Sequence, residues 1–206
     1  MLVPKKQRIL KIFLFCTAAA ILNYTIAFIP MHVLGMPLFL DTIFTAVISF
    51  LFGFIPGLVT TVIYLLISYI RHHDINIFFI CIIAEVTLVS GLKPAIDQPL
   101  KPFKSNKERD FAILISILAR LMLLYITVFL AVSILGGLID YIYYDIMKNI
   151  WPYYTAPDIF KMAFTETGLP KLAINILSRI PINIIDRFIV IFGGYFIARI
   201  LVKFTR

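Results

Sequence analysis

The chain has 206 residues, of which 61% are hydrophobic and only 15% are charged, and its mean hydropathy is +0.98. A soluble domain is roughly 45–50% apolar and about 25% charged, so this chain cannot cover itself with polar surface. A water-soluble enzyme, a nucleic-acid-binding protein and a disordered protein are therefore excluded as first interpretations. The net charge of +8 instead fits the basic cytoplasmic loops of a membrane protein.

Six apolar runs predict an all-α integral membrane protein, a bundle of six transmembrane helices formed by one domain over residues 1–206. The predicted spans are residues 12–30, 38–52, 56–70, 75–92, 111–138 and 169–202. The second and third are separated by residues 53–57 (Gly-Phe-Ile-Pro-Gly), where the proline removes a donor and the glycines permit a tight reversal. Residues 139–168 form a predicted external segment.

The orientation of the spans follows from the Lys and Arg residues in the connections. Twelve lie on the side of the two termini and four on the opposite side, so we expect both termini in the cytoplasm. The basic start followed by residues 12–30 also resembles a signal peptide. Because the apolar run continues past Ala18 with no polar cleavage region, a retained helix is the prediction.

Ionisable residues inside a predicted span are costly in a bilayer, so they usually face a partner or a cavity and mark function. Glu85 and Arg120 each lie about ten residues into their helices, near the midplane, which predicts an ion pair between adjacent helices. Such a pair contributes to a binding site or only fixes the helix register. Asp41, one turn into the second helix, contacts a ligand from outside or caps its own helix.

The last predicted helix carries a polar stripe. Asn175, Arg179, Asn183 and Arg187 follow one another at intervals of four residues, which places them on one slowly drifting helix face. On a membrane helix such a face points into the bundle or into an aqueous pocket. We therefore name Asn175 and Arg179, with Glu85, as candidate ligand-binding residues.

Two features are candidates for docking a partner subunit. Asp186 and Arg187 lie toward the cytoplasmic end of the last helix and form either an interfacial docking pair or a snorkelling pair. In the first helix, the small-residue surface that includes Cys16 and Ala20 lets another helix approach closely. That second helix belongs either to a partner or to the bundle itself.

The external segment 139–168 is rich in aromatic residues, among them Tyr144 and Trp151. Aromatic residues are enriched at membrane interfaces, which is one interpretation. The other is a lid that stacks Tyr144 and Trp151 on a planar ligand. Acidic residues outnumber basic ones in this segment, so a strongly anionic ligand gains little from it.

The sequence contains none of the common catalytic or nucleotide-binding motifs, so we predict no enzyme activity and no cofactor. The turn His72-His73-Asp74 has too few ligands nearby for a metal site. Cys16 and Cys81 lie in different spans, so they are interpreted as packing residues and no disulfide is expected.

Two stretches resemble a recurring membrane pattern. Residues 35–45 (Gly-Met-Pro-Leu-Phe-Leu-Asp-Thr-Ile-Phe-Thr) with residues 53–57 look like the second and third helices of S components, the substrate-binding subunits of energy-coupling factor (ECF) transporters. Related bacterial membrane sensory regions are similar. Residues 178–187 (Ser-Arg-Ile-Pro-Ile-Asn-Ile-Ile-Asp-Arg) look like the start of the last helix of that group. Many members carry an Ala-x-x-x-Ala motif in helix one, whereas here Ala20 is followed four residues later by Tyr24.

The resemblance implies a multi-pass protein of the bacterial inner (cytoplasmic) membrane that captures a vitamin or similar small nutrient from outside. It also implies a transmembrane coupling subunit and two ATP-binding subunits as partners, with the lipid bilayer around them and no nucleic acid. In this hypothesis Glu85, Arg120, Asn175 and Arg179 form the polar part of the pocket, and Asp41 closes it. The alternatives are a ligand-sensing membrane module that signals through a partner chain, and a solitary transporter.

Overall fold

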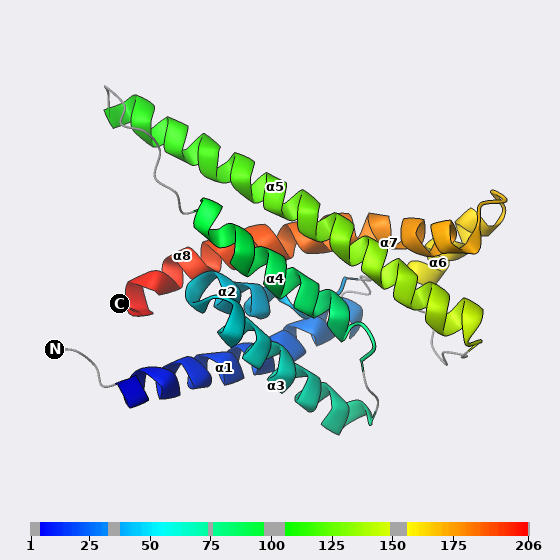
Figure 1. Cartoon of the computed structure of the whole chain (residues 1–206), viewed down its shortest axis with the longest axis horizontal. Coiled ribbons are helices and arrows are strands. Elements are labelled where there is room, and N and C mark those ends of the chain that lie inside the picture. The colour runs from blue at the N-terminus through cyan, green and yellow to red at the C-terminus, as the bar shows by residue number, and fades with distance from the viewer. Residues whose placement is uncertain (1–4, 33–37, 74–75, 97–105, 149–155, 206) are drawn as a thin grey trace.

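The computed structural model describes residues 5–32, 38–73, 76–96, 106–148 and 156–205, and among these there is no strand. The chain is all-α, as predicted, and each predicted span is helical over most of its length. In chain order the helices are α1 Lys5–His32, α2 Ile43–Phe52, α3 Phe54–His72, α4 Phe79–Ile96, α5 Asn106–Asp140, α6 Ala156–Thr165, α7 Lys171–Phe188 and α8 Gly194–Thr205 (Figure 1). Two π-helical segments are continuous with them: η1 (Tyr141–Ile146) extends α5, and η2 (Ile189–Gly193) joins α7 to α8.

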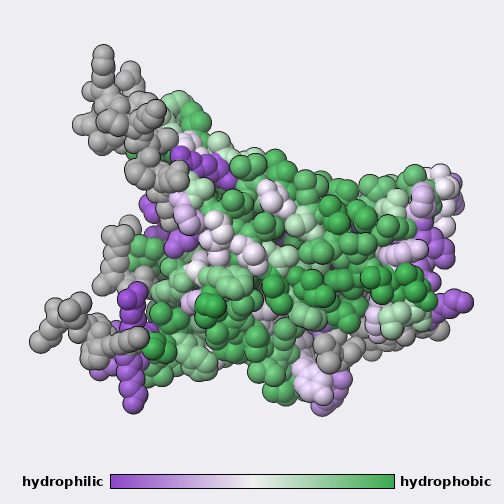
Figure 2. Space-filling model, in the orientation of Figure 1, coloured by the Kyte–Doolittle hydropathy of each residue, from purple (hydrophilic) through white to green (hydrophobic). Residues whose placement is uncertain are grey.

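Four helices of the described chain are long and apolar enough to cross a membrane. They are Lys6–Ala27, Phe54–Arg71, Phe79–Ile96 and Phe111–Ile146. Figure 2 shows the consequence on the surface, where hydrophobic side chains cover the middle of the molecule and hydrophilic ones gather toward its two ends. A surface this apolar is suited to lipid, not to water, so the chain is a membrane protein. The count of six spans stays a prediction.

The ends of the helices fall at two ends of the molecule. The start of α1, the end of α4, the start of α5 and the end of α8 lie at one end, which we call the terminal end (Figure 1). The end of α3, segment η1 and the start of α7 lie at the opposite end. The polar residues of α7 are therefore spread along the depth of the bundle.

Helix α2 is the centre of the bundle. It packs against α1, α3, α4 and α8, and its buried residues include Val47, Ser49 and Phe50. With 10 residues it rises only about 15 Å, roughly half the thickness of a bilayer core. The prediction of a span over 38–52 is therefore met only in its second part, because α2 begins inside the protein.

The break between α2 and α3 is a single residue, as the Gly-Phe-Ile-Pro-Gly sequence predicted. Gly53 has φ +89°, a conformation that favours glycine, and it separates the two helices. Pro56 falls in the first turn of α3, where a backbone donor has no partner within the helix. A side-chain carbon at Gly57 would collide with Ser49 of α2 and Val86 of α4, so this glycine lets three helices meet.

A second close approach joins α5 to α7 through a pair of glycines. A Cβ atom at Gly137 would lie 2.6 Å from the Cα atom of Ile176, and one at Gly136 would lie 2.9 Å from the side chain of Arg179. The bare surface of α5 therefore accepts the backbone of α7 at one position and the arginine side chain at the next. This contact fixes where the polar stripe of α7 sits.

We expect Gly137→Ala to lower the thermal unfolding midpoint of the purified protein by several degrees, because the new methyl group meets backbone atoms of α7 and overpacking of this kind costs roughly 1–3 kcal/mol. Gly91→Ala is the matched control, since a Cβ atom there meets nothing within 4 Å. Alanine is the better helix former, so the control should be neutral or slightly stabilising. Equal midpoints for the two variants would contradict the close approach.

Candidate functional site

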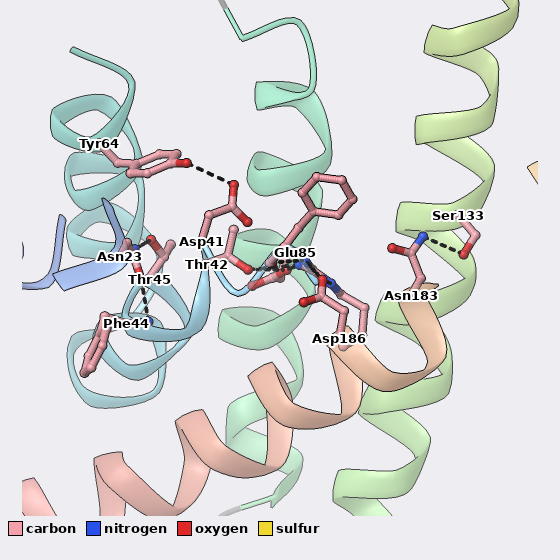
Figure 3. Close-up of polar contacts among 12 residues, drawn as sticks. Asn23, Asp41, Thr42, Phe44, Thr45, Tyr64, Glu85, Ser133, Asn183 and Asp186 are labelled. Carbon is pink, nitrogen blue, oxygen red and sulfur yellow. Dashed lines mark hydrogen bonds and ion pairs between the residues drawn. The ribbon is translucent and has the colours of Figure 1, made fainter. Parts of the chain in front are cut away.

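The guanidinium of Arg187 lies at the centre of a buried polar network. Arg187 is 5% exposed, and it pairs with the carboxylates of Glu85 on α4 and of its own neighbour Asp186. It also donates hydrogen bonds to Thr42 Oγ1 at 2.9 Å and to the backbone carbonyl of Phe39 at 3.3 Å. Figure 3 shows these bonds converging from three segments. One side chain thus ties α7 to α4 and to the chain before α2.

The network exists because the chain enters α2 inside the bundle. Non-helical backbone at membrane depth has to find its partners within the protein. The carbonyl of Phe39 accepts a hydrogen bond from Arg187, and the backbone N–H of Phe44 donates to Asn23 Oδ1 at 2.8 Å. The amide group of Asn23 donates in turn to Thr45 Oγ1 at 2.8 Å. A fully buried asparagine on α1 therefore caps the first turn of α2 from another helix.

Acidic groups outnumber basic ones in this interior. Asp41, Glu85 and Asp186 surround Arg187, and we call these four residues the Arg187 cluster. Asp41 accepts a hydrogen bond from the Tyr64 hydroxyl at 3.0 Å and lies beside Glu85 in Figure 3. The second carboxylate oxygens, Glu85 Oε1 and Asp186 Oδ1, are buried without a hydrogen-bond partner. One guanidinium therefore pairs with two carboxyl groups and has a third, Asp41, nearby.

A second polar cluster lies around Arg179, about two turns from Arg187 toward the start of α7. Arg179 holds Asp140 with two bonds, Nε to Oδ2 at 2.7 Å and Nη2 to Oδ1 at 2.9 Å. This two-pronged geometry is the strongest form of the arginine–carboxylate contact. The guanidinium also lies over the Phe78 ring, 4.3 Å from its centroid. Lys161 of α6 approaches the same carboxylate at 3.4 Å, which brings α6 over the pair.

The first turn of α7 and segment η1 extend this cluster toward the surface. Asn175 donates to Asp145 Oδ2 at 2.7 Å, and Lys171 pairs with Asp145 at 3.1 Å. The Lys161 ammonium group sits 5.0 Å from the centroid of the Tyr144 ring. These residues, with Arg179 and Asp140, are called the Arg179 cluster below. Tyr144 and Asp145 belong to the π-helical segment η1, and π-helical turns are frequent at functional sites.

An open apolar groove of about 250 Å³ runs beside the Arg179 cluster. Its walls come from the start of α4 and from the end of α5 with η1, and they are formed by Ile77, Phe79, Ile80, Ile139, Ile142 and Tyr143. A second groove, of about 330 Å³, lies on the flank of α3. Ile77 and Phe79, which line the first groove, flank Phe78, and the Arg179 guanidinium lies over the Phe78 ring. The groove is therefore close to the charged pair, although neither Arg179 nor Asp140 lines it.

The predicted Glu85–Arg120 ion pair is wrong. Arg120 donates to the backbone carbonyls of Ala95 at 2.8 Å and Ile96 at 3.3 Å, at the end of α4. Glu85 lies ten residues before Ala95 on the same helix, about 15 Å away. The free carbonyls of a helix C-terminus attract a cation, and the crossing of α5 brings Arg120 to that end. Arg187 takes its place beside Glu85.

The prediction that the α7 stripe faces inward is confirmed. Asn175, Asn183 and Arg187 are buried, and the Arg179 side chain is 13% exposed. Asn183 donates to Ser133 Oγ of α5 at 2.9 Å (Figure 3). The stripe does not serve one site, however. Its outer members belong to the Arg179 cluster and its inner member to the Arg187 cluster, and the side chains bond chiefly to one another.

The four residues predicted to dock a partner all lie inside the protein. Cys16 and Ala20 are buried against α3, where the Cys16 thiol donates to the carbonyl of Pro56 at 3.4 Å. Asp186 and Arg187 are buried in the Arg187 cluster. The small-residue surface of α1 therefore serves packing within the bundle, which was the alternative interpretation. A partner cannot reach these side chains in this structure.

The remaining candidates fall in or near the external segment. Trp151 and Asp74 lie outside the described residues. Tyr144 packs edge-on against Tyr143 with ring centroids 5.2 Å apart. No group of three or more His, Cys, Asp or Glu residues within the described chain is arranged to hold a metal ion.

The structure adds residues that sequence reasoning did not select, above all Asp140, Thr42 and the backbone of Phe39. Asp140 carried a usable signal, because it follows Gly136 and Gly137 by one helical turn and a glycine pair in a helix indicates close approach of another backbone. No sequence signal marked the carbonyl of Phe39, since whether this carbonyl lies outside a helix depends on where α2 begins. No family model matches the chain, and neither a curated protein nor a solved structure matches it.

We expect Arg187→Met to reduce stability far more than Glu85→Gln. Loss of the guanidinium removes the ion-pair partner of Glu85 and Asp186 and leaves Glu85 with only the hydrogen bond from Thr42 among its described side-chain contacts. Breaking a buried ion pair costs about 3–5 kcal/mol. Glu85→Gln keeps the side-chain shape and leaves the bond between Arg187 and Asp186. The measurement is the yield and thermal unfolding midpoint of both variants in detergent. Equal losses would show that Arg187 is not the centre of the network.

Proposed function

We propose that this protein captures a small nutrient at the outer face of a bacterial cytoplasmic membrane, in the manner of the ECF S components that its sequence resembles. The ligand site is the Arg179 cluster together with the adjacent apolar groove. The ligand class is a small dipolar molecule with a cationic group, an anionic group and an apolar body.

One observation carries this proposal. The Arg179–Asp140 pair joins α7 to the end of α5, and Lys161 of α6 also contacts Asp140. The end of α5 lies opposite the terminal end of the molecule (Figure 1), and an apolar groove lies close to the pair. Small-molecule sites are mostly apolar with a few placed polar groups that fix orientation. Arg179 matches a ligand carboxylate, Asp140 matches a ligand ammonium group, and the groove matches the rest of the molecule.

The proposed topology has six spans, with both termini in the cytoplasm. Support comes from the two termini lying at the same end of the molecule and from the excess of Lys and Arg in the connections at that end. In this arrangement α2 and the continuous segment α7–η2–α8 complete the bundle begun by the four apolar helices. The Arg179 cluster then faces the exterior.

The proposed partners are a transmembrane coupling subunit and two ATP-binding subunits, which the ECF resemblance implies. The described helices form a bundle without a nucleotide-binding motif, so the energy for uptake comes from elsewhere. Cys16, Ala20, Asp186 and Arg187 are buried, so the proposed coupling subunit docks on another surface. The exposed apolar face of α1 at the terminal end, which includes Phe13 and Leu14, is the replacement candidate.

The ligand site predicts that native mass spectrometry of purified protein detects a retained small molecule, and that Arg179→Gln and Asp140→Asn abolish its retention. Arg199→Gln, on the exposed surface of α8, is the control and should retain it. The second arm is a thermal-shift panel of zwitterionic amino acids and vitamins. Retention by all variants, or stabilisation only by singly charged compounds, would contradict the site.

The topology predicts that green fluorescent protein fused after Arg206 is fluorescent, since it folds in the cytoplasm. Alkaline phosphatase fused at the same place should be inactive, whereas a fusion after Lys148 should be active. Lys148 lies in the predicted external segment, two residues after the end of η1. The reverse pattern of activities would overturn the proposed orientation.

A further inference from the structure

The Arg187 cluster holds more carboxyl groups than one arginine can balance. Full ionisation of Asp41, Glu85 and Asp186 would place three negative charges around one positive charge inside a membrane protein. Glu85 and Asp186 are 1% and 0% exposed, so water does not compensate them. The next cation along α7, Arg179, is already held by Asp140.

Two buried carboxyl oxygens without a hydrogen-bond partner show where negative charge is not compensated. Glu85 Oε1 and Asp186 Oδ1 have no hydrogen-bond partner, although each belongs to a carboxyl group whose other oxygen bonds to Arg187. An unpaired ionised carboxylate in such a place is strongly disfavoured, and a group in this position usually becomes neutral instead. A proton on either free oxygen neutralises that carboxyl group and leaves its bond to Arg187 in place.

Several titratable or charged groups face the cluster from the helices packed around it. Tyr64 of α3 donates to Asp41, and Tyr24 of α1 lies near Tyr64. Cys81 precedes Glu85 by one turn on α4 and lies within electrostatic reach of Arg179, Arg187 and Asp140. Among the residues that the structure describes, the titratable or charged groups in or near the cluster are Tyr24, Asp41, Tyr64, Cys81, Glu85, Asp140, Arg179, Asp186 and Arg187.

We propose that the Arg187 cluster is a proton-binding site, in which at least one of Glu85 and Asp186 is a carboxylic acid at neutral pH and exchanges its proton with bulk water. Binding forms an O–H bond at the free carboxyl oxygen from a proton of the solvent, and release returns that proton. The site is separate from the Arg179 cluster and does not depend on the proposed ligand.

Proton release has a structural consequence, because the cluster joins α7 to α4 and to the chain before α2. Loss of the proton adds a negative charge between these segments and favours their separation. Helix α7 is suited to respond, since Pro181 removes one of its backbone hydrogen bonds and η2 follows it directly. Protonation therefore biases the position of α7, which also carries Arg179.

Infrared difference spectroscopy of the protein in lipid nanodiscs tests the site directly. At pH 7 the wild type should show the C=O stretching band of a protonated carboxylic acid, which shifts in D₂O and disappears as the pH is raised. Glu85→Gln or Asp186→Asn should remove or shift the band. Asp158→Asn, a partly exposed residue of α6 that pairs with Lys161 and not with Arg187, is the control and should leave it unchanged.

A thermal-unfolding series covers the case in which a variant does not fold. Wild-type protein should lose stability as the pH rises and the buried proton is released, and added sodium should not restore it. A wild-type spectrum without the acid band at pH 7 overturns the proposal. So does stability that depends on sodium and not on pH, because the occupant would then be a metal cation.

Discussion

The bond from Arg187 to the carbonyl of Phe39 follows from one constraint, that the chain starts α2 in the middle of the bundle instead of at a membrane surface. Any backbone left outside a helix at that depth loses its hydrogen bonds unless the protein replaces them. Arg187 supplies a donor on one side, and Asn23 supplies a donor and an acceptor on the other. The position of α2 therefore requires polar side chains from α1 and α7.

Helix α7 links the two clusters mechanically. Arg179 and Arg187 are eight residues apart, about 12 Å along the axis, and Pro181 lies between them. Gly136 and Gly137 of α5 hold the outer half of α7 so closely that a shift of this helix changes the Arg179–Asp140 contact. The inner half is held by Arg187. The two clusters are thus connected through one continuous helix.

Sequence reasoning predicted the helical elements and the inward face of α7, because both depend on local periodicity and hydropathy. It also located the break at Gly53, since proline and glycine act on their own backbone. It did not predict the partner of Glu85. That choice depends on how far α5 and α7 slide along α4. Helix register is set by long-range contacts such as Gly137 with Ile176, which local sequence patterns do not reveal. The pairing of Arg179 with Asp140 was not predicted for the same reason, because it depends on the register between α5 and α7.

The pairing of Arg179 with Asp140 bears on which ligands such a site can accept. A singly charged ligand that displaced Asp140 would leave the mostly buried Arg179 without its carboxylate partner, and one that displaced Arg179 would leave buried Asp140 with Lys161 alone among its described ion pairs. That cost falls on the complex. A dipolar ligand satisfies both at once, so the proposed site discriminates through this penalty as much as through attraction. Lys161 adds to this effect, because it approaches Asp140 from α6 and has to move aside or share the carboxylate. For the proposed ligand site, selectivity therefore depends on the position of α6, which carries Lys161 to Asp140.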